Sequence, residues 1–240
     1  MKNVTLLALD TATEACSVAL LRGGEKTHLA QFAQREHTKH ILPMVDEILA
    51  QAGITLRQVD ALVFGRGPGS FTGVRIGAGI AQGLGFGAEL PVIPVSNLAA
   101  MAQAAYAKYQ AENVLTAIDA RMSEVYFAQW QAQKVRSDFG AFLDWQPMIA
   151  EQVCSPSKVI EQVAQQHHEN AVLAGTGWAA YPELKETNLG KATEITLPSA
   201  LYMLDLALPK WFAGETISPL EIEPIYLRNE VTWKKLPGRE

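Results

Sequence analysis

Two aspartates in this sequence each end a short apolar run that is typical of a β-strand. Asp10 is followed by Thr11 and Thr13, and Asp119 is followed by Arg121. A carboxylate held at a strand end can bind Mg²⁺ or its waters, while the amides of the turn that follows can hold phosphate oxygens. These residues are therefore candidates for a nucleotide-phosphate site.

A glycine-rich turn after the apolar residues 171–174 is a third candidate segment, with Gly175 and Gly177 on either side of a threonine. The alternative role of all three segments is structural. Asp10 and Asp119 would then accept hydrogen bonds within their own turns, and the glycines would only shape a strand–helix connection. We favour the structural role, and the nucleotide site stays a hypothesis.

Nucleophilic and metal-ion chemistry find little support in the sequence. Ser70 stands one position too early for the nucleophile elbow of a serine hydrolase, and no histidine or acid can be assigned to it. We expect Ser70 or Thr72 to cap a helix instead. His37 and His40 stand three residues apart at the start of a predicted helix, where we expect them to serve structure or an interface.

The composition is typical of a soluble, cytoplasmic protein with a sizeable core. The chain has 240 residues, a net charge of −5 and 48% hydrophobic residues, which suits one large or two small domains. Its negative charge does not favour a surface devoted to nucleic acid. The two cysteines lack metal-ligand spacing. Residues 90–107 are uncharged but contain prolines and polar residues, so we expect no membrane span.

Hydrophobic patterning predicts the order β-β-β-α-β-α-β-α over the first 109 residues. The predicted elements cover residues 4–9, 17–21, 27–32, 38–52, 59–64, a glycine-rich helix to about 87, 92–95 and 97–109. This order is the plan of a ribonuclease-H-like domain, because a single doubly wound parallel sheet would lack the opening hairpins.

A weak internal repeat predicts a second domain of the same kind. Residues 115–119 and 125–130 repeat the pattern of strand, aspartate, turn and strand, so that Asp119 corresponds to Asp10. We expect an α/β protein with a duplicated ribonuclease-H-like fold, similar to that of actin, Hsp70 chaperones and sugar kinases. Its two subdomains would span residues 1–109 and 110–240, with the C-terminal segment packing back on the first.

In the superfamily with this duplicated fold, the two aspartate hairpins face each other across a cleft that holds nucleotide phosphates and a metal. A later loop contacts adenosine. The resemblance implies candidate cofactor-binding positions at Asp10, Thr11, Thr13, Asp119, Gly175 and Gly177.

Five short segments form a more distinctive set. The longest covers residues 67–77 and reads GPGSFTGVRIG, and the others cover residues 10–13, 35–38, 119–121 and 224–228. Together they resemble the TsaB (YeaZ) proteins, the small relatives of the TsaD/Kae1 family of tRNA threonylcarbamoyladenosine synthesis. The chain is identified as a member of that group.

The catalytic relatives in the TsaD family carry a metal-binding His-x-x-x-His on the helix after the short fifth strand. Two histidines four residues apart lie on one helical face and can share an ion. Here Asn97 and Met101 stand at these positions, and an amide and a thioether are poor ligands for a hard catalytic metal. The resemblance therefore implies no metal site and no catalytic residue.

Two predicted helices of the first domain carry more apolar surface than one sheet can cover. The helix at 38–52 has two apolar stripes, and the next helix has no charge from 76 to 88 and three glycines at four-residue spacing. Each glycine costs a helix roughly 1 kcal/mol relative to alanine, which favours a closely packed partner. The predicted interface comprises Ile41, Leu42, Val45, Ile48, Leu49, Val74, Gly79, Gly83 and Gly87.

The resemblance also implies partners. In similar proteins these helices pair with TsaD, or with a second copy when TsaD is absent. With the ATPase TsaE, the complex transfers threonylcarbamoyl from its adenylate to N6 of adenosine 37 in tRNAs reading codons that start with A. The resemblance implies only indirect contact with tRNA, no tightly bound cofactor, and ATP or ADP only within the complex. The alternatives are an autonomous ATP-dependent enzyme of the same fold or a glycoprotease-like peptidase.

Overall fold

Two five-stranded sheets with the same strand arrangement form the framework of the computed structural model, which describes residues 4–137, 140–166 and 169–228. The first sheet has the order β3-β2-β1-β4-β5. Its antiparallel part is β1–β3 and its parallel part adds β4 and β5 to β1. The strands are β1 (Thr5–Asp10), β2 (Ala15–Arg22), β3 (Glu25–Phe32), β4 (Ala61–Gly65) and β5 (Val92–Val95).

The second sheet repeats this plan with the order β8-β7-β6-β9-β10. Here β6, β7 and β8 are antiparallel, and β9 and β10 continue the sheet parallel to β6. The strands are β6 (Asn113–Arg121), β7 (Glu124–Ser137), β8 (Gly140–Cys154), β9 (Val172–Ala174) and β10 (Lys191–Ala192). The predicted duplication of a ribonuclease-H-like unit is therefore confirmed.

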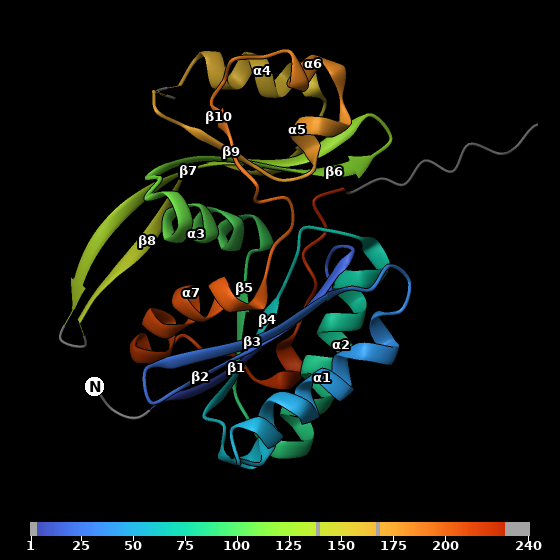
Figure 1. The fold of residues 1–240 in the computed structure, drawn as a ribbon, viewed down its shortest axis with the longest axis vertical. Coiled ribbons are helices and arrows are strands. Elements are labelled where there is room, and N and C mark those ends of the chain that lie inside the picture. The colour runs from blue at the N-terminus through green and yellow to red at the C-terminus, as the bar shows by residue number, and fades with distance from the viewer. Residues whose placement is uncertain (1–3, 138–139, 167–168, 229–240) are drawn as a thin grey trace, which may run out of the picture.

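The helices cover both sheets in layers, as Figure 1 shows. Helices α1 and α2 lie on the outer face of the first sheet, α3 and α7 lie between the sheets, and α4, α5 and α6 lie on the outer face of the second. Their bounds are α1 (His37–Gln51), α2 (Phe71–Ala88), α3 (Asn97–Tyr109), α4 (Pro156–Ala164), α5 (Gly177–Ala180), α6 (Pro182–Lys185) and α7 (Ala200–Ala213), with short 3₁₀ turns η1 (Leu56–Gln58) and η2 (Pro219–Glu221).

The two middle helices are exchanged between the subdomains. Helix α3 follows the first sheet in sequence, but its Leu98 and Met101 pack in a core with Val114 of β6. Helix α7 follows the second sheet, but its Met203 packs in a core with Leu6 of β1. Most side chains of α3 are buried, as expected for a helix that is apolar on every side and enclosed between two sheets.

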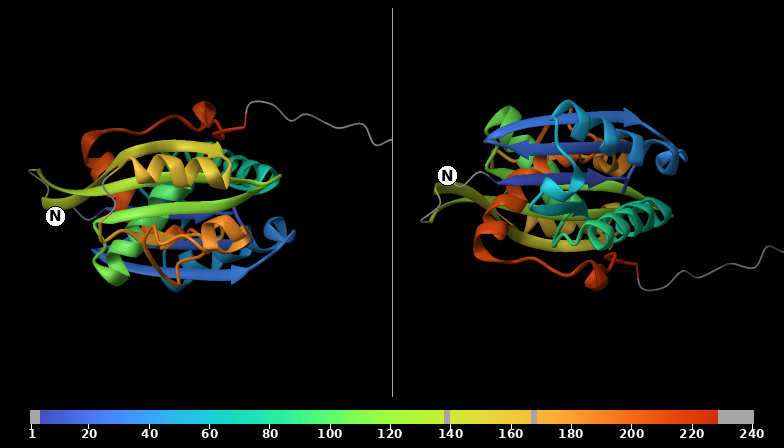
Figure 2. Two further views of the ribbon diagram at one scale, coloured as in Figure 1. Left: turned by 90° about the horizontal axis from the view of Figure 1, so that it is seen from above. Right: turned by 90° about the horizontal axis from the view of Figure 1, so that it is seen from below.

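The C-terminal segment also returns to the first subdomain. Beyond α7, Ile217 forms an isolated antiparallel bridge with Val92 of β5. From the other direction, the long β7–β8 ribbon of the second sheet reaches down beside α3 and α7, which Figures 1 and 2 show from three sides. Sequence position alone therefore does not separate the two subdomains.

Among helices in the described ranges, none has the length and hydropathy needed to cross a bilayer.

Candidate functional site

The β1–β2 and β6–β7 turns lie next to each other between the subdomains. The Arg121 guanidinium of the second turn lies 3.4 Å from the Glu14 carboxylate of the first turn. The same guanidinium lies 2.7 Å from the carboxylate of Asp119. The structure thus brings together the turns that follow Asp10 and Asp119, with an arginine between their acidic groups.

Asp10 is completely buried at the end of β1. Its Oδ1 accepts hydrogen bonds from Asn97 Nδ2 at 2.7 Å and from the Ala12 N–H at 3.3 Å. Its Oδ2 is buried and has no hydrogen-bond partner among the described residues. Desolvation raises the pKa of Asp10 to about 6, although the bond from Asn97 lowers it.

Asn97 connects three parts of the fold with one side chain. Its Nδ2 donates to Asp10, its Oδ1 accepts from the Gly67 N–H at 2.8 Å, and its own N–H donates to the Gly67 carbonyl at 3.0 Å. This buried amide therefore joins the end of β1, the glycine-rich turn and the first residue of α3. Sequence reasoning noted Asn97 as a replaced ligand but missed its role as a bridge, because its partners lie far away in the chain.

The donor groups at this place do not fit a catalytic metal. The oxygen and the nitrogen of the Asn97 side chain are both engaged, and Met101 one turn later is fully buried near Gly175. In the part of the chain that the structure describes, no group of three or more His, Cys, Asp or Glu side chains could hold an ion. Residues 97 and 101 thus serve packing and hydrogen bonding.

The glycine-rich segment packs directly on the first aspartate turn. A Cβ atom at Gly69 would lie 2.2 Å from the Ala12 carbonyl oxygen, and one at Gly73 would lie 2.2 Å from the Thr11 carbonyl oxygen. The Ser70 N–H also donates to the Ala12 carbonyl at 2.7 Å, and the Thr11 hydroxyl donates to the Gly73 carbonyl at 2.7 Å. The Thr11 hydroxyl and the Ala12 carbonyl therefore face the start of α2.

The other polar groups near this turn are also engaged within the protein. Ser70 caps α2 by accepting a bond from the Gly73 N–H at 3.4 Å. His37 is buried, and its Nε2 lies 2.6 Å from the Thr13 carbonyl oxygen, so the ring donates there. The Thr13 hydroxyl accepts from the Ala15 N–H at 3.4 Å.

The second aspartate is held by its own turn and by a tyrosine. Asp119 Oδ1 accepts from the Arg121 N–H at 2.9 Å and from the Tyr181 hydroxyl at 2.7 Å. Desolvation, together with the bond to Asp119, raises the pKa of Tyr181 to about 12. Tyr181 was missed in the sequence, because a single tyrosine before a short helix carries no motif.

The third candidate segment lies beside the second turn. The Asp119 N–H donates to the Thr176 hydroxyl at 3.2 Å. A Cβ atom at Gly175 would lie 1.9 Å from the Ala117 carbonyl oxygen, and one at Gly177 would lie 3.0 Å from the same oxygen. Close packing on β6 therefore accounts for both glycines.

The exposed face of α2 combines open space at three glycines with exposed apolar side chains. Cβ atoms at Gly79, Gly83 and Gly87 would meet nothing within 4 Å. Phe71 and Phe86 on the same helix are 60% and 67% exposed. Leu42 of the neighbouring α1 is 41% exposed, so both helices carry exposed apolar side chains.

Five residues predicted for a partner interface lie in the core instead. Helix α1 packs against β2, β3 and α2, so its apolar side chains other than Leu42 are largely covered within the subdomain. The prediction was wrong for the residues whose side chains are buried: Ile41, Val45, Ile48, Leu49 and Val74. Leu42 and the three exposed glycines stay predicted interface residues.

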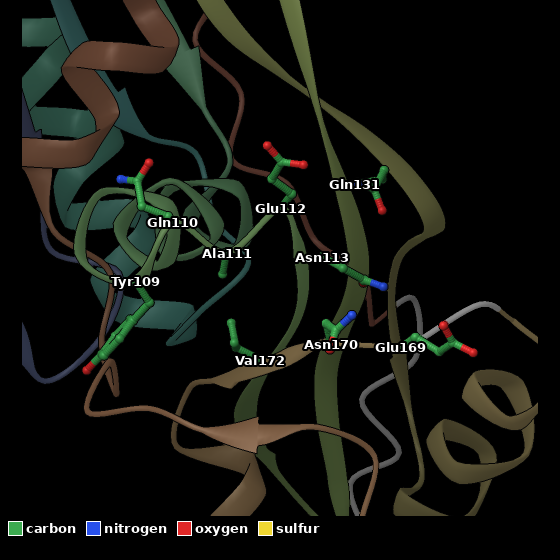
Figure 3. Close-up of a pocket in the computed structure, with 9 residues that line it drawn as sticks. All are labelled: Tyr109, Gln110, Ala111, Glu112, Asn113, Gln131, Glu169, Asn170 and Val172. Carbon is green, nitrogen blue, oxygen red and sulfur yellow. The ribbon is translucent and has the colours of Figure 1, made fainter.

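A polar cavity of about 470 Å³ lies elsewhere, at the end of the second sheet where β6 begins (Figure 3). It is lined by amides, two carboxylates and a few apolar groups from Tyr109, Gln110, Ala111, Glu112, Asn113, Gln131, Glu169, Asn170 and Val172. None of the candidate site residues lines it.

Comparison with known proteins agrees with this architecture. Residues 29–211 match the family described as "TsaD: tRNA N6-adenosine threonylcarbamoyltransferase". Two relatives are named tRNA threonylcarbamoyladenosine biosynthesis protein TsaB. The one from Haemophilus influenzae is 68% identical over the whole of both chains, and the one from Escherichia coli is 51% identical over 98% of this chain and 99% of its own. The chain belongs to the TsaB (YeaZ) family.

A solved TsaB-family structure supports the same assignment. The structure of YeaZ from Pseudomonas aeruginosa is 42% identical and superposes with a TM-score of 0.83, covering 93% of this chain and all of its own. The family resemblance inferred from five short segments is therefore confirmed. Their most specific part, the glycine-rich segment, is the part that packs on the Asp10 turn.

The two kinds of glycine on α2 predict opposite effects of alanine on stability. Gly73→Ala places a methyl group against the Thr11 carbonyl, and we expect it to lower the free energy of unfolding by about 1–3 kcal/mol. Gly79→Ala, the matched control in open space, should raise it by about 0.5–1 kcal/mol because alanine favours a helix. Urea denaturation measures both, and equal effects would show that Gly73 does not make this contact.

The raised pKa of Asp10 predicts a pH dependence of stability. The folded state holds this proton more tightly than the unfolded chain, so the stabilisation is complete below pH 3.8 and is lost as the pH rises through about 6. The loss is about 1.4 kcal/mol for each pH unit of the shift. Relative to the native protein, Asp10→Asn should therefore gain stability between pH 4 and pH 7.

Urea denaturation of Asp10→Asn across that pH range measures this effect. The control is Asp46→Asn at an exposed position of α1, whose stability should follow that of the native protein at every pH. Parallel stability curves for the native protein and Asp10→Asn would contradict the assignment.

Proposed function

We propose that this TsaB-family chain is a non-catalytic subunit in the formation of N6-threonylcarbamoyladenosine in tRNA. The observation that carries the proposal is the buried Asn97 amide, which joins Asp10 to Gly67 at the position where TsaD-type relatives place a metal-binding histidine. The reacting metal and the acyl transfer would then belong to a TsaD-type partner. The names of the relatives from Haemophilus influenzae and Escherichia coli support the biosynthetic role.

The exposed glycine face of α2 is proposed as the surface that binds this partner. Its glycines leave room for another helix to approach closely, and Phe71, Phe86 and Leu42 supply apolar contacts at its margin. Without the partner, the same face would pair with a second copy of the chain. The ATPase TsaE would join the assembled pair, and contact with tRNA would be indirect, consistent with the net charge of −5.

The proposal assigns no tightly bound cofactor to the isolated chain. In the first turn the Thr11 hydroxyl and the Ala12 carbonyl are bonded to the start of α2, and the Asp119 carboxylate is held by Arg121 and Tyr181. ATP or ADP would enter only in the assembled complex, which we expect to work in the cytoplasm. Hydrolysis of Mg-ATP by the isolated chain would instead support an autonomous enzyme.

Reconstitution tests the proposed function. Purified TsaD and TsaE with tRNA, ATP, threonine and bicarbonate, plus the enzyme that makes the adenylate, should modify adenosine 37 only when this chain is added. Nucleoside analysis of the digested tRNA measures the product. Full modification without the chain would overturn the proposal.

Variants on α2 test the proposed surface separately. Gly79→Leu fills the open space on the glycine face and should weaken association with TsaD at least about tenfold, while the fold is kept. Leu42→Glu should act in the same direction. Lys108→Leu, at the exposed C-terminal end of α3, is the control, and its affinity should be unchanged. Calorimetric titration measures all three, and native affinity of Gly79→Leu would exclude this surface.

A further inference from the structure

The described C-terminal segment crosses from one subdomain to the other. After η2, residues 222–228 run along the glycine-rich turn of the first subdomain, where the Ile225 N–H donates to the Arg66 carbonyl at 3.0 Å. The segment then reaches the β6–β7 turn of the second subdomain through Arg228. Figure 1 shows this path as the red stretch between the two sheets.

The turn that this segment reaches has an unfavourable backbone. Arg121, Met122 and Ser123 have φ values of 61°, 55° and 60°. These values lie in the left-handed region, which is unfavourable for most residues other than glycine and asparagine. Arg121 pairs with Glu124 across the hairpin, so Met122 and Ser123 form a two-residue loop. Such loops strongly prefer Asn-Gly, and the sequence of this turn therefore opposes its own conformation.

Arg228 supplies contacts that hold this turn from outside. Its guanidinium donates to the Ala120 carbonyl at 3.2 Å and to the Arg121 carbonyl at 3.4 Å, and it forms an ion pair with Glu124. It also lies 3.4 Å from the sulfur of Met122. The two terminal nitrogens of one guanidinium thus contact four residues of the hairpin, Ala120, Arg121, Met122 and Glu124, whereas lysine would offer a single nitrogen.

Two residues before Arg228, Tyr226 attaches the same segment to α2. The ring of Tyr226 lies 5.8 Å from the ring of Phe71, the first residue of that helix. The Arg75 guanidinium lies 3.3 Å from the centre of the Phe71 ring and 4.8 Å from that of Tyr226. This aromatic and cationic cluster fixes the segment on the first subdomain while Arg228 is bound to the second.

We propose that residues 222–228 form a clasp that joins the two subdomains and holds the β6–β7 turn in its strained conformation. Because that turn carries Arg121, which contacts Asp119 and Glu14, the clasp also determines how the two aspartate turns face each other. Release of the clasp lets the turn relax and uncovers the region between them. The attachment at Phe71 links the clasp to the helix surface proposed for TsaD, and this link alone rests on the proposed function.

Hydrogen exchange on the isolated full-length chain tests the clasp without any partner. Arg228→Ala should speed exchange of the backbone amides of residues 119–125 about tenfold or more, because the turn then opens locally. Arg57→Ala in the exposed η1 is the control and should leave these amides unchanged. Unchanged exchange in Arg228→Ala would overturn the proposal.

A background in which the β6–β7 turn is unstrained distinguishes the proposed clasp from a general loss of stability. In a background with Met122→Asn and Ser123→Gly, the loop prefers its observed conformation, so Arg228→Ala should speed exchange by less than about threefold. The same factor in both backgrounds would show that Arg228 does not hold the strain. Arg228→Lys keeps the charge but loses the planar fork, and it supplies the same comparison if the alanine variant does not fold. Arg228→Lys should speed exchange of these amides by a larger factor with the native turn sequence than with the relaxed one.

Discussion

One buried amide holds the centre of this structure together. Asn97 donates to the Asp10 carboxylate and accepts from the Gly67 N–H, so it joins the first strand, the glycine-rich turn and the first helix between the sheets. Loss of this side chain would leave the Gly67 N–H buried without its partner and the Asp10 carboxylate with only the bond from the Ala12 N–H, which costs more than a hydrogen bond contributes. The turn at Gly67 that this bridge holds leads directly to Gly69 and Gly73, which pack against the first turn.

Polar contacts also join the two subdomains, because hydrogen-bonding and charged groups of one subdomain find their partners in the other. Arg66 lies 2.6 Å from the Glu151 carboxylate of β8, and the Trp145 indole of β8 donates to Gln103 of α3 at 2.9 Å. Paired in this way, the groups favour one relative orientation of the two sheets. We infer that their main effect is on specificity of orientation, since buried ion pairs contribute little net stability.

The two faces of α2 use glycine for different reasons. One face of the helix presents Gly73 and Gly77 to the first turn, where larger residues would collide with it. The opposite face keeps Gly79, Gly83 and Gly87 in open space, where alanine would give a more stable helix. Glycine on the packed face serves the fold, whereas glycine on the open face fits the proposed association.

Local patterns were enough to predict the strand Val92–Val95, the helix Asn97–Tyr109, the duplicated fold and the family, because periodicity and short motifs depend on neighbouring residues. They could not show which apolar face of a helix meets solvent. Ile41 and Leu49 lie on different stripes of α1, yet both are buried, since the sheet and α2 cover them from two sides. The partner of Asp10 was equally hidden, because Asn97 is 87 residues away and only the tertiary structure brings the two side chains together.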